Sequence, residues 1–239
     1  MAKKEKIQML FDGISADYDK LNHLLSMNVD KGWRRRAVRR LCNEKRAMSY
    51  LDVACGTGDF AFAIADRADR LPESQGSVVV GLDLSEGMLN VAKKKLEKHT
   101  WDNVKVMLRQ GDCEALPFED DSFDRISVGF GVRNFEHLEI GLSEMLRVLK
   151  PGGRLVILEL SVPSNRLIGL IYGWYFTRIL PFIGGKISGD RPAYEYLPAS
   201  VLKFPKPEVF VPMLEHTGYR NVVHKALSLG ICRMYIAEK

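Results

Sequence analysis

The stretch Leu51–Phe60, LDVACGTGDF, runs from an apolar, strand-like segment through a Gly-x-Gly turn into a helical pattern. A dinucleotide-binding loop of the G-x-G-x-x-G type would have a third glycine where Ala61 stands. No Gly-Lys-Ser/Thr sequence follows, which excludes the phosphate loop of nucleoside triphosphatases. The stretch therefore predicts a strand–turn–helix unit that approaches a ligand closely but does not cradle a pyrophosphate.

Apolar runs of strand length alternate with helical patterns on both sides of this loop. The expected strands are 49–55, 78–85, 104–112, 123–131 and 152–161, and the expected helices are 59–71, 86–99 and 137–153. Residues 221–239 read as two strands joined by a short Leu-Gly connection, which is typical of an antiparallel hairpin. We therefore predict an α/β, Rossmann-like fold with a mostly parallel seven-stranded sheet, an antiparallel C-terminal hairpin and helices on both faces.

The remaining segments are expected to belong to the same single domain, residues 1–239. Residues 11–41 show helical spacing of apolar side chains, and residues 1–46 are interpreted as an N-terminal helical cap. Residues 162–207 are interpreted as an apolar insertion that forms part of the substrate site. Residues 191–218 are rich in proline and are expected to be a loop followed by one helix before the hairpin.

The centre of the insertion, Leu167–Ile183, is unusually rich in apolar and aromatic side chains. Only 11 residues separate Arg166 from Arg178, fewer than the ~20 that a transmembrane helix needs. Two interpretations remain open. The segment either packs on the core or forms a lid or an interfacial patch for an apolar substrate.

The 239-residue chain has a formal net charge of +5, and six of the ten residues in Lys31–Arg40 are Lys or Arg. This run is either a solvated helix face or a surface attracted to an anionic membrane. Nucleic acid is a poor candidate, because the chain has no zinc-finger spacing, RNP motif or repeated aromatic-basic pattern. The four cysteines form no C-x-x-C pair and have no metal-ligand spacing with the histidines, and no signal peptide is visible. We expect a cytoplasmic protein without a metal site.

Acidic residues stand near the ends of the first three expected strands, at the sheet edge where α/β folds bind ligands. Asp52 and Asp59 flank the Gly56–Gly58 turn, where carboxylates would repel a phosphate but suit an ammonium or sulfonium group. Asp83 can bind both hydroxyls of a ribose. Asp112 can accept from an exocyclic amine, and the Cys113 N–H can meet a ring nitrogen of the same base. Together, in this order, these groups predict S-adenosylmethionine as the cofactor.

Longer motifs resemble those of one family. Tyr18–Arg34, YDKLNHLLSMNVDKGWR, matches an N-terminal signature, and Arg147–Ser161, RVLKPGGRLVILELS, matches a second one. An Arg-Asn pair lies in Gly129–Phe135, GFGVRNF. The chain thus resembles the class I S-adenosylmethionine-dependent methyltransferases, and more narrowly the ubiquinone/menaquinone biosynthesis C-methyltransferases. His23 and Asp30 depart from the residues usual at those positions of the first signature.

The resemblance implies a site and a reaction. Thr57, Asp83, Asp112 and Cys113 align with the family's cofactor contacts, and Asp52 and Gly56 complete the predicted cofactor set. The family methylates a ring carbon of a polyprenylated quinol. We therefore expect demethylmenaquinol to be converted to menaquinol in the final step of menaquinone biosynthesis. The same methylation of a ubiquinone-precursor benzoquinol stays open as an alternative.

A hydroquinone carbon becomes a good nucleophile when the ring hydroxyl loses its proton, so the site should stabilise a phenolate. Our candidates for this catalytic role are Arg133 and Asn134, with Arg133 as a cation that holds the phenolate or activates a water. Tyr18, His23 and Glu159 are further candidates.

Three rival functions are weaker. They are a non-catalytic cofactor-binding subunit of a quinone-synthesis complex, an NAD-dependent oxidoreductase and a methyltransferase for another small molecule or RNA. The apolar substrate and the basic residues of Lys31–Arg40 predict peripheral contact with the inner face of the cell membrane. The sequence does not fix the oligomeric state, and a homodimer stays open.

Overall fold

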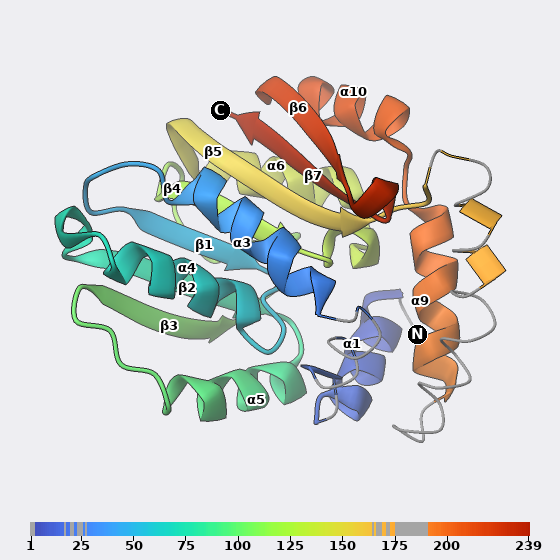
Figure 1. The fold of residues 1–239 in the computed structure, drawn as a ribbon, viewed down its shortest axis with the longest axis horizontal. Helices are drawn as coiled ribbons and strands as arrows, with labels where there is room; N and C mark the ends of the chain where they lie inside the picture. Colours follow the sequence, from blue (N-terminus) through green and yellow to red (C-terminus); the bar gives the residue numbers. More distant parts are fainter. Residues whose placement is uncertain are drawn as a thin grey trace.

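The computed structural model describes residues 3–16, 18, 19, 22, 26, 28–163, 165, 169, 170, 173, 174 and 191–239, with only the backbone of 191–195. Its centre is a seven-stranded sheet in the order β3-β2-β1-β4-β5-β7-β6 (Figure 1). The strands are β1 (Ser49–Val53), β2 (Ser77–Asp83), β3 (Val104–Gln110), β4 (Phe123–Gly129), β5 (Leu149–Leu160), β6 (Arg220–Leu227) and β7 (Cys232–Glu238). The helices are α1 (Lys3–Ile14), α3 (Val29–Leu41), α4 (Asp59–Asp69), α5 (Glu86–Leu96), α6 (Leu138–Val148), α9 (Arg191–Lys203) and α10 (Pro207–Thr217), with 3₁₀ turns η1 (Pro72–Ser74), η2 (Val132–Asn134) and η4 (Ser228–Gly230).

The predicted fold is confirmed. β1 to β5 pair in parallel, whereas β7 pairs antiparallel with both β5 and β6 and so closes the sheet with the expected hairpin. One face of the sheet packs on α6 and α10, through side chains such as Leu142 and Phe210. The other face packs on α3 and α4, through side chains such as Val38 and Ile64. Burial on both faces explains why the central strands are almost continuously apolar.

The site lies where the strand order reverses. β1 pairs with β2 on one side and with β4 on the other, so the connections after these strands leave in opposite directions. The register places Asp52 opposite Gly81 on β2 and opposite Ser127 on β4. This pairing fixes the acid at the end of β1 in the middle of the sheet's carboxyl edge.

The helix expected over 137–153 is shorter than predicted. α6 ends at Val148, and β5 already begins at Leu149, so the Pro-Gly-Gly sequence lies inside the strand. Pro151 disfavours helical geometry at the residue before it, which ends the helix early. Gly152 then adopts a φ of 72°, a left-handed conformation that suits glycine and bends the start of the strand.

The expectation of a loop followed by one helix over 191–218 was wrong, because this range contains two helices, α9 and α10. The prediction failed because the prolines of this range do not exclude a helix. Pro192 lies in the first turn of α9, where a missing N–H costs nothing. Pro198 lies inside α9 but is tolerated there, since Leu197 and Val201 pack against Ile14 and Met88 on neighbouring helices.

The two segments added to the sheet are only partly described. Residues 1–46, the expected cap, contain the helices α1 and α3, whereas His23 lies outside the described residues. Most of Leu167–Ile183 also lies outside them, so the interpretation of this stretch is untested. α1 is anchored on α5 because the Asp12 carboxylate accepts a 2.9 Å hydrogen bond from the Gly87 N–H.

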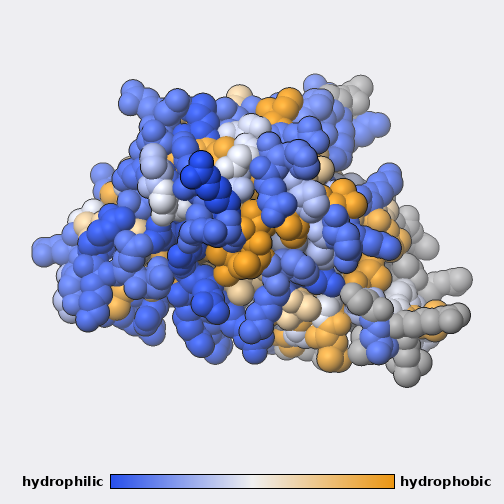
Figure 2. Space-filling view, turned by 90° about the horizontal axis from the view of Figure 1, so that it is seen from above, coloured by the Kyte–Doolittle hydropathy of each residue, from blue (hydrophilic) through white to orange (hydrophobic). Residues whose placement is uncertain are grey.

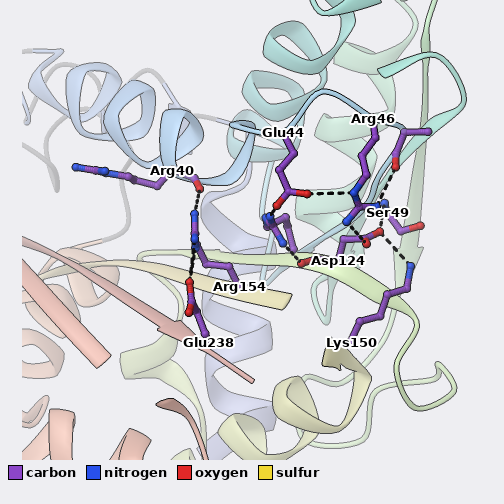
Figure 3. A network of polar contacts seen from close by, with 10 residues as sticks. Arg40, Glu44, Arg46, Ser49, Asp124, Lys150, Arg154 and Glu238 are labelled. Atoms are coloured by element: carbon purple, nitrogen blue, oxygen red, sulfur yellow. Dashed lines mark hydrogen bonds and ion pairs between the residues drawn. The ribbon is translucent and has the colours of Figure 1, made fainter. Parts of the chain in front are cut away.

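A polar network holds the opposite, amino edge of the sheet (Figure 3). Asp124, at the start of β4, accepts from the Ser49 N–H at 2.9 Å, from Arg46 at 2.9 Å and from Lys150 at 3.0 Å. Burial opposes ionisation of Asp124, but these three donors outweigh it and lower its pKa. The network ties the segment before β1 to β4 and β5, far from the ligand edge, and we assign it a structural role.

Candidate active site

Two neighbouring cavities lie at the carboxyl edge of the sheet, with volumes of about 100 and 170 Å³. Both are lined by Tyr18, Ala54, Gly56, Gly129 and Phe130, so they meet at the loop after β1. The first extends past the ends of β2 and β3 beneath α1, and the second extends toward α3 and α9. We call them the β2–β3 cavity and the α3–α9 cavity.

The loop after β1 has the conformation that its glycines predict. Gly56 and Gly58 have φ values of 55° and 85°, in the left-handed region that side chains disfavour. A Cβ on Gly58 would also lie 2.6 Å from the Phe62 ring. The Cys55 side chain is buried against Gly81, and burial raises the pKa of its thiol well above the usual range. Cys55 is therefore a packing residue.

Asp52 is fully buried and lines the α3–α9 cavity. Its Oδ1 accepts a 2.6 Å hydrogen bond from the Ser127 hydroxyl, while its Oδ2 has no hydrogen-bond partner among the described residues. Burial raises the pKa of Asp52 to about 7, although the Ser127 hydroxyl and the nearby Ala61 N–H work in the other direction. A buried carboxylate oxygen without a donor is costly unless a ligand supplies one.

Asp83 lies at the end of β2 and lines the β2–β3 cavity. Its two oxygens accept from the Gly56 N–H at 2.7 Å and from the Ser85 N–H at 2.8 Å. Burial raises the pKa of Asp83, and these N–H groups oppose that effect. Each oxygen retains a second lone pair, so Asp83 can hold the glycine loop and still accept from a ligand hydroxyl.

Asp112 and Cys113 line the far end of the same cavity. Asp112 forms an ion pair with Lys4 of α1 and accepts from the Glu114 N–H at 3.0 Å. Burial works against ionisation of Asp112, but Lys4 and this N–H outweigh it and lower its pKa. The N-terminal helix therefore reaches the acid that was predicted to meet the base of the cofactor.

Thr57 lines the α3–α9 cavity beside a cluster of charges. Its hydroxyl donates to Asp19 of the N-terminal cap, and Asp19 also pairs with Lys95 of α5 at 2.8 Å. Lys95 and Arg34 both pair with Asp59, the latter at 3.1 Å. Because cations already neutralise Asp59, Asp52 is the better candidate to bind a cationic group of a ligand.

Arg133 is held rigidly on the opposite wall of the α3–α9 cavity. Its Nη1 pairs with Glu159 at 2.8 Å and also donates to the Phe130 carbonyl, and its Nε donates to Ser200 at 3.2 Å. Only 4% of the Arg133 side chain and 1% of the Glu159 side chain are exposed. Burial would lower the pKa of Arg133, but Glu159 raises it further, so the guanidinium stays charged.

Asn134 is next to this ion pair but faces the other cavity. It lines the β2–β3 cavity, and its Oδ1 accepts a 2.9 Å hydrogen bond from the Tyr196 hydroxyl of α9. Tyr18 lines both cavities, and its pKa is raised by burial against the opposing effect of Arg133. Tyr18 is therefore a neutral phenol near pH 7.

Known proteins resemble this chain over its full length. The model of the ubiE/COQ5 methyltransferase family matches residues 1–239. The chain belongs to the ubiE/COQ5 methyltransferase family. A Bacteroides fragilis relative named demethylmenaquinone methyltransferase is 41% identical over 99% of this chain and 94% of its own. A Geobacter sulfurreducens relative named ubiquinone/menaquinone biosynthesis C-methyltransferase is 45% identical over 99% of this chain and 90% of its own.

Solved methyltransferases share the fold of this family member. A possible histamine N-methyltransferase of Thermotoga maritima has a TM-score of 0.63 at 19% identity, covering 97% of this chain and 98% of that one. Phosphoethanolamine N-methyltransferase 2 of Haemonchus contortus, solved with S-adenosylmethionine, has a TM-score of 0.60 at 17% identity over 87% of this chain and 52% of that one. S-Adenosylmethionine is the cofactor of this methyltransferase.

The buried groups of the site fit this cofactor. The Asp52 Oδ2 atom lacks a donor, and the α-ammonium group of S-adenosylmethionine is a suitable one. The cofactor also carries a ribose for Asp83 and a base for Asp112 and Cys113, all at the β2–β3 cavity. The predicted cofactor residues, Asp52, Gly56, Thr57, Asp83, Asp112 and Cys113, are thus brought together around two adjoining cavities.

Several lining residues were missed by the sequence reasoning. Lys4, Gln8 and Phe11 of α1 line the β2–β3 cavity, and Leu197 of α9 lines the α3–α9 cavity. Their spacing in the sequence indicates a helix but not the surface on which that helix packs. Arg34 was grouped with the surface cations, but its side chain is only 15% exposed and pairs with Asp30 and Asp59.

We predict that cofactor binding is coupled to release of a proton from Asp52. Because its pKa is about 7, the group is largely protonated at pH 6, and a cationic ligand beside it favours the ionised form. The affinity for S-adenosylmethionine should therefore fall as pH decreases below 7, by up to roughly tenfold per pH unit. Isothermal titration between pH 5.5 and 7.5, in two buffers of different ionisation enthalpy, measures the affinity and the proton count.

The same shift has a consequence for the free protein. Because the pKa of Asp52 is raised, the protonated carboxyl contributes to the stability of the fold at low pH. This contribution is lost as pH rises from about 4 to about 7. The free energy of unfolding of the Asp52→Asn variant should therefore exceed that of wild type by more at pH 8 than at pH 4. Its affinity for the cofactor should no longer depend on pH. An affinity that stays level between pH 5.5 and 7.5 in the wild type would contradict the role of Asp52.

Proposed function

We propose that this protein transfers a methyl group from S-adenosylmethionine to a ring carbon of a polyprenylated quinol, converting demethylmenaquinol to menaquinol. The full-length match to the ubiE/COQ5 methyltransferase family supports the reaction class. Relatives named demethylmenaquinone methyltransferase, including one of Thermus thermophilus at 43% identity, support the substrate. The observation that carries the proposal is a charged, buried Arg133 in a cavity that adjoins the cofactor loop.

The test is the mass of quinones extracted from a strain that lacks the protein. A species lighter by one methyl group should accumulate, and the gene on a plasmid should remove it. The purified enzyme should methylate a short-chain demethylmenaquinol in a single turnover. Accumulation of a benzoquinone precursor instead would assign the ubiquinone branch, and unchanged quinones would reject the proposal.

In the proposed reaction S-adenosylmethionine supplies an electrophilic methyl group. The task of the protein is to orient the quinol ring, exclude water and stabilise the phenolate that makes the ring carbon nucleophilic. Nε and Nη1 of Arg133 are engaged by Ser200, Glu159 and Phe130. Nη2 is not held by any described residue, so we assign it to the phenolate oxygen or to a water beside it.

Asn134 and Tyr18 are proposed to complete this environment. The Asn134 side chain is fixed through its carbonyl oxygen, and its NH₂ group, which bonds to no described residue, can donate. Tyr18 lies between the two cavities as a neutral phenol, so it can donate a hydrogen bond but is a poor base near pH 7. The proton of the quinol hydroxyl would then leave through water rather than to a strongly basic side chain.

We also propose that residues 162–207 receive the isoprenoid tail. Leu197 of this segment lines the α3–α9 cavity. Leu170, Trp174 and Leu202 are 66, 63 and 64% exposed, although each is a large apolar side chain. Exposed large apolar side chains in a segment that also lines a cavity are typical of a surface that meets lipid or an apolar ligand.

The basic face of α3 is proposed to contact the membrane. Arg36, Arg39 and Arg40 of α3 surround a surface cavity together with Lys225 of β6, and no ion pair joins these four cations to a described residue. Leu229, at the tip of the C-terminal hairpin, is 73% exposed. Figure 2 shows a hydrophobic area bordered by strongly hydrophilic atoms on the face seen from above. Exposed cations and exposed apolar side chains both suit an anionic lipid surface. No described helix is long and apolar enough to cross a membrane.

Replacing Arg36, Arg39 and Arg40 by Ser should weaken binding to anionic vesicles by on the order of 100-fold, since each charge near the surface contributes about 1 kcal/mol. Lys93, Lys94 and Lys98 on and after α5 provide a control with the same loss of charge at the β3 end of the sheet (Figure 1). Cosedimentation with vesicles measures both. Equal losses of vesicle binding in the two triple variants would indicate a general charge effect. A separate experiment, velocity sedimentation of the wild type without vesicles, tests whether the protein is a homodimer.

A further inference from the structure

α9 presents polar side chains to the Arg133–Asn134 pair. Tyr196 and Ser200 are four residues apart, so they lie on the same face of the helix. Each contacts one member of the pair, over 60 residues away in the sequence. One helix thus touches both residues that the proposed reaction requires.

The contact with Asn134 fixes the orientation of its amide. The Tyr196 hydroxyl lies 2.9 Å from Asn134 Oδ1 and donates to it. An Asn side chain has one carbonyl and one NH₂ group on the same carbon, so a donor at the carbonyl turns the NH₂ group away from α9. Burial raises the pKa of Tyr196, although Arg133 opposes this, and the phenol therefore keeps its proton near pH 7.

The contact with Arg133 also has a defined direction. Ser200 donates its hydroxyl hydrogen to the Leu197 carbonyl at 2.8 Å, so its lone pairs are free to accept from Arg133 Nε at 3.2 Å. Glu159 holds Nη1 of the same guanidinium at 2.8 Å. With Nε and Nη1 both fixed, the plane of the guanidinium is set, and with it the direction of Nη2.

α9 is attached to the rest of the fold by its apolar side. Val201 is buried with Ile14 and Met88, and Leu197 packs against this group. Leu197 also lines the α3–α9 cavity. The position of α9, and hence of both polar contacts, therefore depends on packing between the N-terminal cap and the segment proposed to receive the tail.

We propose that Tyr196 and Ser200 are positioning residues, which orient Asn134 and Arg133 for turnover only when α9 is docked beside the cavity. This inference rests on the proposed roles of Arg133 and Asn134. It adds that the segment proposed to receive the isoprenoid tail also sets the geometry at the reacting end of the substrate. A bound tail that holds α9 in place would then increase kcat rather than only decrease KM.

Double-mutant cycles test the positioning role. Tyr196→Phe should lower kcat by about three- to tenfold, the effect of one hydrogen bond, with the affinity for S-adenosylmethionine unchanged. In an Asn134→Ala background the same substitution should lower kcat no further. Ser200→Ala should behave likewise with Arg133→Gln, and Ser200→Thr, which keeps the hydroxyl, should retain turnover.

The controls separate positioning from folding. Tyr219→Phe removes a buried hydroxyl that donates to the Leu142 carbonyl, away from both cavities, and should lower the melting temperature without changing kcat. Equal losses from Tyr196→Phe with and without Asn134 would overturn the positioning role. If Asn134→Ala and Arg133→Gln themselves retain turnover, the proposed catalytic roles fail. If those two lose turnover while Tyr196→Phe and Ser200→Ala do not, only this inference fails.

Discussion

Arg133→Ala is expected to lower kcat by about 100- to 1000-fold, the usual effect of removing a buried group that stabilises charge in the transition state. S-Adenosylmethionine binding should be unchanged, because Arg133 contacts none of the loop or strand-end groups assigned to the cofactor. The guanidinium is charged, almost fully buried and already oriented by Glu159. Rapid-quench turnover with a short-chain demethylmenaquinol measures the effect, and titration calorimetry measures cofactor affinity.

This substitution also leaves Glu159 buried without its cation, which typically costs 3–5 kcal/mol of stability. The double variant Arg133→Gln/Glu159→Gln removes both charges together and should fold better while remaining equally inactive. Arg133→Lys retains the charge but cannot reach both Glu159 and Ser200, so its turnover should be intermediate. A folded double variant with wild-type kcat would reject the phenolate role.

Asp83→Ala is expected to weaken S-adenosylmethionine binding by about 100- to 10,000-fold. The carboxylate is assigned to two ribose hydroxyls, and each hydrogen bond to a charged group contributes about 1.5–3 kcal/mol. The variant also loses the bonds from Gly56 and Ser85 that hold the glycine loop. Titration calorimetry of the purified variant measures the dissociation constant.

The Asp83 result needs a comparison with loop stability. Asp83→Asn keeps the shape and one acceptor, so its affinity should fall between those of wild type and Asp83→Ala. Asp66→Ala removes a surface acid on α4 that accepts from the Trp101 ring at 2.9 Å, and cofactor affinity should not change. A dissociation constant within threefold of wild type for folded Asp83→Ala would exclude the ribose contact.

Most of the sheet could be predicted because its determinants are local. Alternating apolar runs and helical patterns gave the parallel strands, and the Leu-Gly connection indicated the hairpin formed by β6 and β7. The same reasoning failed at 137–153 and at 191–203. In the first range, Pro151 belongs to strand β5 rather than to the end of a helix. In the second range, the packing of Leu197 and Val201 outweighs the cost of an internal proline.

The cofactor edge was predictable for a related reason. Parallel strands end at the same edge, so acids that follow successive strands are brought together by the fold itself. Asp52, Asp83 and Asp112 need no long-range information beyond the strand order. The Arg133–Asn134 pair was identified by its resemblance to a family motif, and its position beside the cofactor loop follows from the place of β4 next to β1.

By itself, the sequence determined the sheet, the turn through Gly56 and Gly58 and the position of three acids at one edge of the sheet, because each follows from neighbours along the chain. Tertiary structure alone decided which distant side chains complete the site. Lys4 reaches Asp112, Arg34 turns inward to Asp30 and Asp59, and α9 brings Tyr196 and Ser200 to Arg133 and Asn134. These contacts depend on how helices pack on the sheet, and the spacing of residues within a helix does not specify that packing.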